Sequence, residues 1–171
     1  SRGGAPPAGR VEPPSSRSPP YTEGDLFQVS VPSNWRELQG SGAVTFAPNG
    51  EYGTVNGQSV FTHGVEIGVS RNETHDLQTA TDELISSLSG GNPDLRRAAN
   101  YSRISIGGRR GLRTTLTNRS EVSGQPETIE MSTTPLRDGS LFYGIGGAPT
   151  GEFRDYANVL NRVVGSIRLS D

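Results

Sequence analysis

The feature that most constrains the fold is the segment "SLFYGIGG", residues 140–147, which carries large apolar side chains at consecutive positions. In an extended strand, successive side chains point to opposite faces. Phe142 therefore points to one face, and Leu141, Tyr143 and Ile145 point to the other. A strand that is apolar on both faces is typical of a sheet buried on both sides. The segment predicts a three-layer α/β/α sandwich.

Two segments have the apolar periodicity of helices and supply the cover for such a sheet. The first runs over residues 77–88, begins after Thr74 or Asp76 as N-cap, and ends at "SGGNP". The second closes the chain over residues 153–164. The apolar stripes consist of Leu77, Ala80, Thr81, Leu84, Ile85 and Leu88 in the first helix, and of Phe153, Tyr156, Ala157, Leu160, Val163 and Val164 in the second.

The other apolar segments alternate as strands, and short turns join them into hairpins. Before the first helix lie "LFQVSVP", "AVTFAP" and "HGVEIGVS". Between the helices, Gly107-Gly108 joins one pair of strands and Arg137-Asp138-Gly139 joins another. Hairpins give an antiparallel sheet, so the fold class is α+β, with the sheet covered by helices on both faces. The turn-rich segment at residues 49–58 predicts a loop.

Residues 1–25 differ in composition from the rest of the chain. Hydrophobic residues make up only 30% of the 171 residues, and glycine (23) and proline (12) are abundant. Glycine, serine and paired prolines fill residues 1–25 and keep such a segment extended and solvated. We expect a disordered linker over 1–25, or alternatively a polyproline ligand, followed by one domain over 26–171. Because the chain begins at serine, we also expect it to be part of a longer polypeptide.

Charge and composition exclude several function classes. The formal net charge of −2 provides no long-range field for nucleic acid or an anionic membrane. There is no cysteine for a disulfide, a thiolate nucleophile or a metal site. No apolar run approaches the roughly 20 residues of a membrane span. We expect no nucleic-acid partner, no membrane span, no cofactor and a monomeric domain.

The two histidines are the first candidates for chemistry. His63 is predicted to share a strand face with Val65, whereas Glu66 points to the opposite face. His75 lies at the start of the first helix, where "NETHD" is a helix cap. We therefore expect imidazole and carboxylate groups to point apart, with no catalytic and no metal-binding residues. A hydrolase that uses His63 or His75 remains the alternative hypothesis.

The segment "YGIGGAPTGEF" has the strand–glycine–helix order of a phosphate-binding loop. A dinucleotide fingerprint that starts at Gly144 and Gly146 would have its third glycine at Pro149. No lysine follows, which excludes the P-loop as well. We interpret the glycines as a turn that leads into the last helix.

A third candidate is the run from Arg96 to Arg119, which contains seven arginines and no acidic residue. Side chains on one face would form a basic patch for phosphate or carboxylate groups. Alternation places Arg109 and Arg113 on one face and Arg110 on the other. The run predicts either an anion-binding module that uses Arg109, Arg110 and Arg113, or a solvated hairpin.

In the second case, the arginines would pair with acidic residues elsewhere, such as Glu127 and Glu130 on the next strand. Tyr52 is the candidate for surface recognition, because a tyrosine among glycines on a long loop is a usual place for binding. It could equally be packed against the core.

The order of these elements resembles the PsbP-like domains, a fold shared with the Ran-binding nuclear import factor and bacterial lipoproteins. The opening "FQVSVPSNW", the helix "TATDELISSL", the hairpins and the ending "EFRDYANVLNRVVGSIRL" carry this resemblance over about residues 26–169. The segments "GDLFQVSVPSNWREL", "GVEIGVSRNETHDLQTATDELI" and "SIGGRRGLRTTL" are also similar to the C-terminal region of bacterial prenyl-protease-like zinc metallopeptidases.

That second resemblance implies a non-catalytic accessory domain, for protein binding or scaffolding, at the C-terminus of such a peptidase. The zinc-binding helix of those enzymes has no counterpart in this sequence, so no catalytic residue carries over. The implied partner is the parent catalytic domain or an envelope protein. The implied location is periplasmic or extracellular, and a cytoplasmic location remains the alternative.

Overall fold

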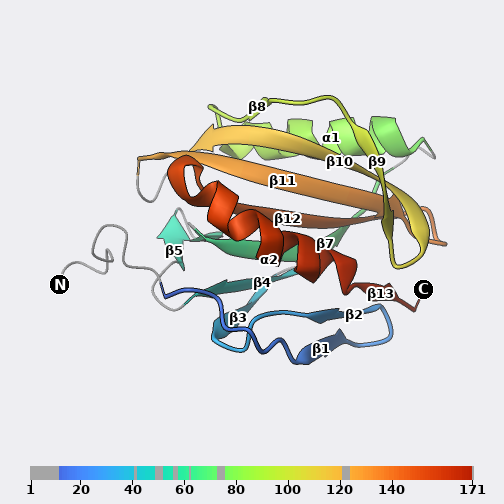
Figure 1. Cartoon of the computed structure of the whole chain (residues 1–171). Helices are drawn as coiled ribbons and strands as arrows, with labels where there is room; N and C mark the ends of the chain where they lie inside the picture. Colours follow the sequence, from blue (N-terminus) through green and yellow to red (C-terminus); the bar gives the residue numbers. More distant parts are fainter. Residues whose placement is uncertain are drawn as a thin grey trace.

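The computed structural model of the chain describes residues 12–40, 42–48, 52–55, 58–61, 63–72, 76–120 and 124–170, with 52–55 and 58–61 described by their backbone alone. An eight-stranded antiparallel sheet forms the middle layer (Figure 1). The strand order is β3-β4-β7-β12-β11-β10-β8, and β9 pairs with β10. The bounds are β3 Trp35–Gly40, β4 Ala43–Pro48, β7 Gly64–Ser70, β8 Arg96–Arg97, β9 Ser102–Ile106, β10 Arg109–Arg119, β11 Pro126–Pro135 and β12 Leu141–Pro149.

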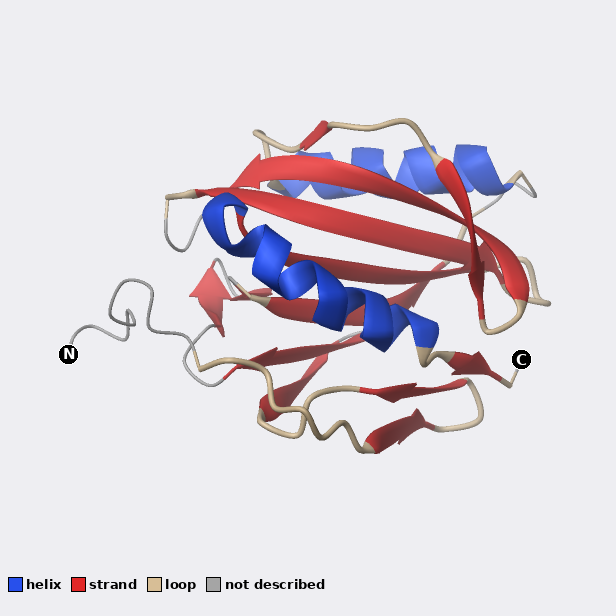
Figure 2. Cartoon of the chain, in the orientation of Figure 1, coloured by secondary structure: helices blue, strands red, loops and turns tan. Residues whose placement is uncertain are grey.

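Two helices lie on opposite faces of this sheet, one in front and one behind in the view of Figure 2. The helical elements are α1 Leu77–Gly91, the 3-10 turn η1 Thr150–Glu152 and α2 Phe153–Gly165. Two smaller sheets complete the described part of the chain. They consist of β1 Pro20–Glu23, β2 Phe27–Ser30 and β13 Arg168–Leu169 in one, and of β5 Tyr52–Val55 and β6 Gln58–Phe61 in the other.

Strand β12 is buried on both faces, as its sequence predicts. Phe142 is 0% exposed and belongs to the hydrophobic cluster that includes the buried side of α2. Leu141 and Tyr143 belong to a second cluster with Ala80 and Leu84 of α1. The strand therefore separates two cores, and the expected α+β sandwich is confirmed.

The predicted hairpins are also present. Gly107 and Gly108 have φ angles of 58° and 81°, the left-handed backbone that a two-residue turn between β9 and β10 requires. Gly139, with φ of 91°, closes the turn between β11 and β12. Within the loop expected at residues 49–58, the described residues 52–55 form a strand that pairs with Gln58–Phe61.

Gly146 shows a second difference from the sequence-based interpretation. The glycines of "YGIGGAP" lie inside β12 and do not form a turn. A Cβ atom added at Gly146 would lie 2.9 Å from Cδ2 of Leu160 in α2. The absence of a side chain at Gly146 therefore lets α2 pack closely on the sheet at Leu160.

Both helices begin and pack nearly as expected. Asp76 is the N-cap of α1 and accepts hydrogen bonds from the backbone N–H of Thr79 (2.9 Å) and from its hydroxyl (2.6 Å). In α2 the buried stripe includes Val159, which the periodicity missed, whereas Ala157 is only half-buried. No helix in the described ranges has the length and apolar character needed to cross a membrane.

The segment predicted as a linker contributes a strand. Pro20–Glu23 forms β1 and pairs with β2, so ordered structure begins before Leu26. β1 pairs with β2 through backbone hydrogen bonds, and such bonds leave no hydrophobic periodicity in the sequence. Residues 1–11 of the predicted linker lie outside the described residues.

Candidate functional site

His63 lies immediately before β7 and is buried between the sheet and α2. Its side chain is 3% exposed, and its Nε2 atom lies 2.9 Å from Oε1 of Glu152 at the end of η1. The imidazole ring also packs on Tyr156 of α2, with 5.1 Å between the ring centroids. The start of α2 thus supplies both a carboxylate and an aromatic ring to this histidine.

The expectation that imidazole and carboxylate groups point apart is wrong for His63. Within β7 the predicted alternation holds, because Val65 packs in the α2-side cluster while Glu66 accepts a 2.8 Å hydrogen bond from the Tyr143 hydroxyl on the opposite face. Glu152 is 89 positions away in the sequence, however. Alternation along one strand carries no information about a carboxylate that another element brings in.

A second carboxylate, that of Glu127, lies within electrostatic range of His63. Glu127 of β11 accepts a 2.9 Å hydrogen bond from Nδ2 of Asn118 in β10. Burial raises the pKa of the Glu127 carboxyl group, while the Asn118 hydrogen bond and the nearby His63 act in the opposite direction. The Oδ1 atom of Asn118 is buried and has no hydrogen-bond partner. We call His63, Glu152, Glu127, Asn118 and Tyr156 the His63 cluster.

The His63 cluster has the residue types of an acid–base site but is closed to a substrate. General acid–base catalysis requires the titrating group to lie within hydrogen-bond reach of the reacting molecule. The His63 imidazole is almost fully buried, and Glu152 holds its Nε2 atom. Within the described ranges, no three or more histidine, cysteine, aspartate or glutamate side chains are placed to hold a metal ion. His75 lies outside the described residues.

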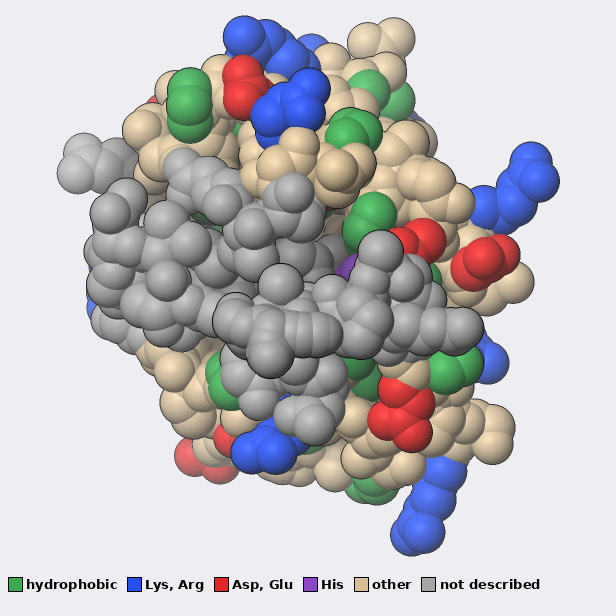
Figure 3. Space-filling model, turned by 90° about the vertical axis from the view of Figure 1, so that its left-hand side faces the viewer, with side chains coloured by type: hydrophobic (Ala, Val, Ile, Leu, Met, Phe, Trp, Pro, Cys, Tyr) green, Lys and Arg blue, Asp and Glu red, His purple; other side chains and the backbone are tan. Residues whose placement is uncertain are grey.

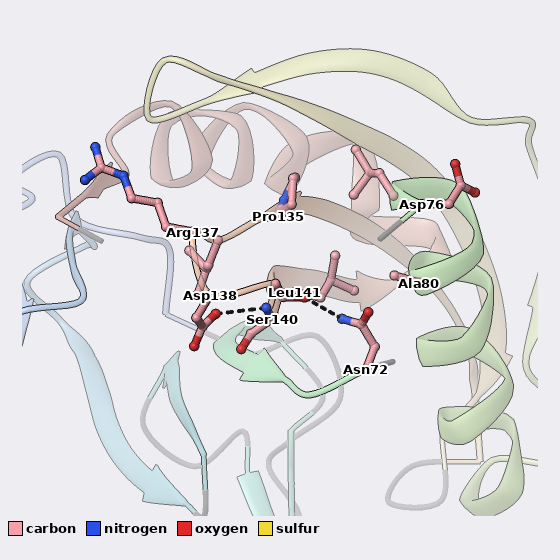
Figure 4. A pocket seen from close by; sticks show the side chains of 11 residues that line it. Asn72, Asp76, Ala80, Pro135, Arg137, Asp138, Ser140 and Leu141 are labelled. Carbon is pink, nitrogen blue, oxygen red and sulfur yellow. Dashed lines mark hydrogen bonds between the residues drawn. The ribbon is translucent and has the colours of Figure 1, made fainter. Parts of the chain in front are cut away.

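A surface cavity of about 240 Å³ lies between the start of α1 and the turn that joins β11 to β12 (Figure 4). Its polar lining comes from Asn72, Asp76, Asp138 and Ser140. In Figure 4 the side chain of Arg137 points away from the other lining residues. The cavity is open to the surface and has two carboxylates on its rim, with Arg71 close enough to act on the Asp138 carboxylate.

The polar groups of this cavity also hold its walls. The Asp138 carboxylate accepts a 2.9 Å hydrogen bond from the Ser140 N–H, and this bond lowers the pKa of Asp138. The hydrogen bonds from Thr79 lower the pKa of Asp76 in the same way. Asn72 Nδ2 donates to the Gly139 carbonyl at 3.2 Å. Two ionised carboxylates on a fixed rim suit recognition of a cationic or hydrogen-bond-donating group on a partner surface.

The arginines considered for anion binding lie along β10. In this strand Arg109 and Arg113 are on one face and Arg110 is on the other. Arg110 is exposed, whereas Arg113 is half-buried and its Nε atom is buried without a hydrogen-bond partner. On the side of the molecule in Figure 3, arginines are spread among carboxylates and do not gather in one basic patch.

The predicted pairing of these arginines with the next strand is not found. In the part of the chain that the structure describes, neither Glu127 nor Glu130 forms a salt bridge with an arginine, and Glu127 bonds to Asn118 instead. Among the described residues, Arg97 is the arginine of this run that forms an ion pair, with Nη1 3.3 Å from Oδ1 of Asp82 in α1. Both partners are exposed, so this pair contributes little to stability.

Tyr52, the candidate for surface recognition, lies at the start of β5 and not on a loop. Only the backbone of this strand is described, so its recognition role stays a prediction. The sequence analysis missed Glu152 and Asn118. A signal for Glu152 exists in hindsight, because an acidic residue just before a helix commonly lies close to the helix N-terminus and to what packs there.

Comparisons with known proteins show the fold. No known protein-family model matches the sequence, and no curated protein shows significant similarity to it. Cyanobacterial PsbP (CyanoP) from Synechocystis sp. PCC 6803 matches with a TM-score of 0.59 and 16% identity, over 96% of this chain and 98% of that one. The Ran-binding protein Mog1p of Saccharomyces cerevisiae matches with a TM-score of 0.59 and 12% identity, over 92% and 97%.

Two further structures extend this set. LpqN, described as involved in cell envelope biogenesis of Mycobacterium tuberculosis, matches with a TM-score of 0.51 and 14% identity, over 91% of each chain. A protein of Bacteroides thetaiotaomicron matches with a TM-score of 0.55 and 18% identity, over 88% of this chain and 47% of that one. This chain therefore spans about half the length of the latter. The expected PsbP-like fold, shared with Mog1p, is confirmed.

Proposed function

We propose that this chain is a non-catalytic accessory domain that binds proteins. The observation that carries the proposal is the closed state of the His63 imidazole, which is 3% exposed and bonded to Glu152. A histidine packed in this way stabilises the junction between β7 and α2 and does not meet a substrate. The likeness of the fold to a Ran-binding protein supports binding as the general role.

The parent polypeptide in this proposal is a bacterial zinc-dependent metallopeptidase of the prenyl-protease-like class, with this domain at its C-terminus. The support is the sequence resemblance of the segments around residues 24–38, 64–85 and 105–116. The partner would be the parent catalytic domain or an envelope protein, and the location periplasmic or extracellular. The chain would act as a monomeric domain over residues 26–171, with part of residues 1–25 as a linker.

Two surfaces are candidates for the contact with a partner. One is the surface cavity lined by Asp76 and Asp138 (Figure 4), whose carboxylates are held in place by hydrogen bonds. The other is the β5–β6 hairpin, which begins with Tyr52. Segments that connect larger elements on a rigid scaffold are common places for recognition.

The test is to express the parent peptidase with and without this domain. We expect loss of the domain to change the binding partners or the location of the peptidase while peptide cleavage by the isolated catalytic centre persists. Unchanged activity, location and partners would contradict the proposal.

Alanine substitution of the histidines separates the accessory role from the hydrolase hypothesis. We expect the His63→Ala, His75→Ala double variant to bind the same partners as the wild-type chain, with lower thermal stability because His63 is buried. Loss of a hydrolytic activity in a variant that remains folded by circular dichroism would favour the hydrolase instead.

Anion binding is the second candidate function. Arg109 and Arg113 lie on one face of β10, where their guanidinium groups would hold an oxyanion together. Binding of polyphosphate should then weaken steeply with added salt. Arg113→Gln should abolish it and Arg110→Gln, on the opposite strand face, should leave it intact. A flat salt response would exclude this function.

A further inference from the structure

The N-terminal strap, residues 13–23, is docked on the domain by hydrogen bonds to its main chain. The Asn34 side chain contacts the strap at two points: its Oδ1 accepts from the Ser15 N–H at 3.0 Å, and its Nδ2 donates to the Pro13 carbonyl at 2.8 Å. The Ser33 N–H donates to the Arg17 carbonyl at 2.8 Å. One side-chain amide and one backbone group thus hold an extended segment by its backbone.

The second half of the strap is added to the edge of a sheet. Residues 20–23 pair antiparallel with β2, whose other edge pairs with β13. Tyr21 is the one aromatic side chain of the strap, and its ring packs on Phe46 at 5.0 Å and on Phe27 at 6.4 Å between centroids. Main-chain pairing together with one anchored side chain is the recognition mode of peptides that add a strand to a sheet.

The strap is weakly attached compared with the core strands. Most of its residues are exposed, and the four prolines at 13, 14, 19 and 20 provide no N–H donors. A cavity of about 390 Å³, lined by Ser16 and Ser18 on one side and by Arg162 and Val163 of α2 on the other, shows that the strap does not pack closely on the helix. Segments with few buried apolar contacts open at low free energy.

We propose that the strap occupies a peptide-binding groove, formed by Ser33, Asn34, the β1-side edge of β2 and the rings of Phe27 and Phe46. An extended segment of a partner protein, with an aromatic residue at the position of Tyr21, binds there in place of the strap. This inference rests on the proposed protein-binding function and names the kind of partner. The side-chain contacts are made by the Tyr21 ring, by the Tyr21 hydroxyl, which accepts from Gln39 Nε2 at 2.9 Å, and by the Ser15 hydroxyl, which accepts from the Ser33 N–H at 2.9 Å. All of these groups are uncharged, so the partner segment needs no particular charge.

In this arrangement the strap is an internal competitor. A ligand that binds only when the strap is released has its affinity reduced by the fraction of molecules in the released state. Weakening the strap without changing the groove therefore strengthens binding of an external peptide. Tyr21 and Ser15 belong to the strap, so substitutions there leave the groove residues Asn34 and Phe46 unchanged.

The experiment uses the full chain and a fluorescent peptide with the sequence of residues 12–24. We expect the peptide to bind the Tyr21→Ala chain at least about tenfold more tightly than the wild-type chain, measured by fluorescence anisotropy. The same peptide with Tyr21→Ala should bind neither chain. A Ser15→Pro chain, which loses the N–H donor to Asn34, is the second weakened variant, should Tyr21→Ala disturb folding. Asn34→Ala, added to either weakened chain, should reduce binding of the peptide.

Equal affinity of the peptide for the wild-type and weakened chains would overturn the inference. A concentration-dependent dimer of the weakened chains without peptide binding would also overturn it, because the groove would then belong to a second copy of the chain. The proposed function fails separately, when deletion of the whole domain leaves the partners of the parent unchanged. If deletion removes partner binding and Tyr21→Ala does not affect it, only the peptide-groove inference fails.

Discussion

Replacing Glu127 with glutamine tests the electrostatics of the His63 cluster. Glu127 accepts a hydrogen bond from Asn118 Nδ2, while the other end of the same amide, Asn118 Oδ1, is buried without a partner. An ionised carboxylate has no proton to donate to that oxygen. Burial raises the pKa of Glu127, which means that the folded protein holds the ionised form at a cost. We therefore expect Glu127→Gln to stabilise the protein at pH 7.

The magnitude of this gain in stability follows from the Asn118 Oδ1 atom, which has no hydrogen-bond partner. The new amide keeps an acceptor for Asn118 Nδ2 and adds an N–H donor for Asn118 Oδ1. An unsatisfied buried acceptor costs about 1–3 kcal/mol. Because Glu127 is only half-buried, solvent screens part of this cost, and we expect a gain of about 1–2 kcal/mol in the free energy of unfolding at pH 7.

The gain should depend on pH with a definite sign. A carboxyl group whose pKa is raised by folding stabilises the protein fully below its unfolded pKa of about 4.3, and this contribution is lost as the pH rises through the folded pKa. At a pH below the folded pKa, the protonated Glu127 carboxyl group can itself donate a hydrogen bond to Asn118 Oδ1. The advantage of Glu127→Gln should therefore be full at pH 7 and should shrink toward zero near pH 4.

Urea unfolding at both pH values measures this difference. With a slope of about 2 kcal/mol/M, the expected gain moves the midpoint by about 0.5–1 M at pH 7. Glu83→Gln, on the exposed side of α1, makes the same charge change and should alter stability by less than about 0.5 kcal/mol. In an Asn118→Ala background most of the gain should disappear. A gain of equal size at both pH values, or a loss at pH 7, would refute the reasoning.

Two further predictions concern the elements that position the cluster and the cavity. Gly146→Ala should lower the free energy of unfolding by about 1–3 kcal/mol, because the new Cβ atom would lie 2.9 Å from the Leu160 side chain. Gly144→Ala is the matched control, because a Cβ atom there has nothing within 4 Å. Equal urea midpoints for the two variants would contradict the packing argument. Asp76→Ala should lower the midpoint of thermal unfolding, because α1 loses its N-cap. Since folding lowers the pKa of Asp76, the difference in midpoint between wild type and variant should be full at pH 7 and should vanish as the pH falls through the folded pKa. A difference in midpoint that does not change with pH would count against this prediction.

Local periodicity was enough to predict the central layer of the fold. The consecutive apolar residues around Phe142 require cover on both faces, and the structure places a separate core on each side of β12. The Gly107-Gly108 turn and the Asp76 cap are equally local, because each depends on residues within a few positions. Such signals are readable because the interacting groups are neighbours in the sequence.

The His63 cluster could not be predicted in this way, because its partners come from different elements. His63 and Glu152 meet only after α2 has packed on β12, and the depth of that packing depends on the missing side chain at Gly146. A glycine in a sequence does not say which helix will approach it. The sequence therefore contains the residues of the cluster but not the distance between them.

The N-terminal strap was missed for a different physical reason. A segment rich in proline and serine lacks apolar periodicity, and low hydrophobicity predicts a solvated chain. Apart from Tyr21 and the Ser15 hydroxyl, the contacts that hold the strap are made by its backbone, through Asn34 and the edge of β2, and backbone contacts leave no pattern in the sequence. A site that recognises mainly the main chain is hard to predict from the segment it holds. In the proposed groove, the same property leaves most positions of a partner segment unconstrained, and an aromatic residue is required only at the position of Tyr21.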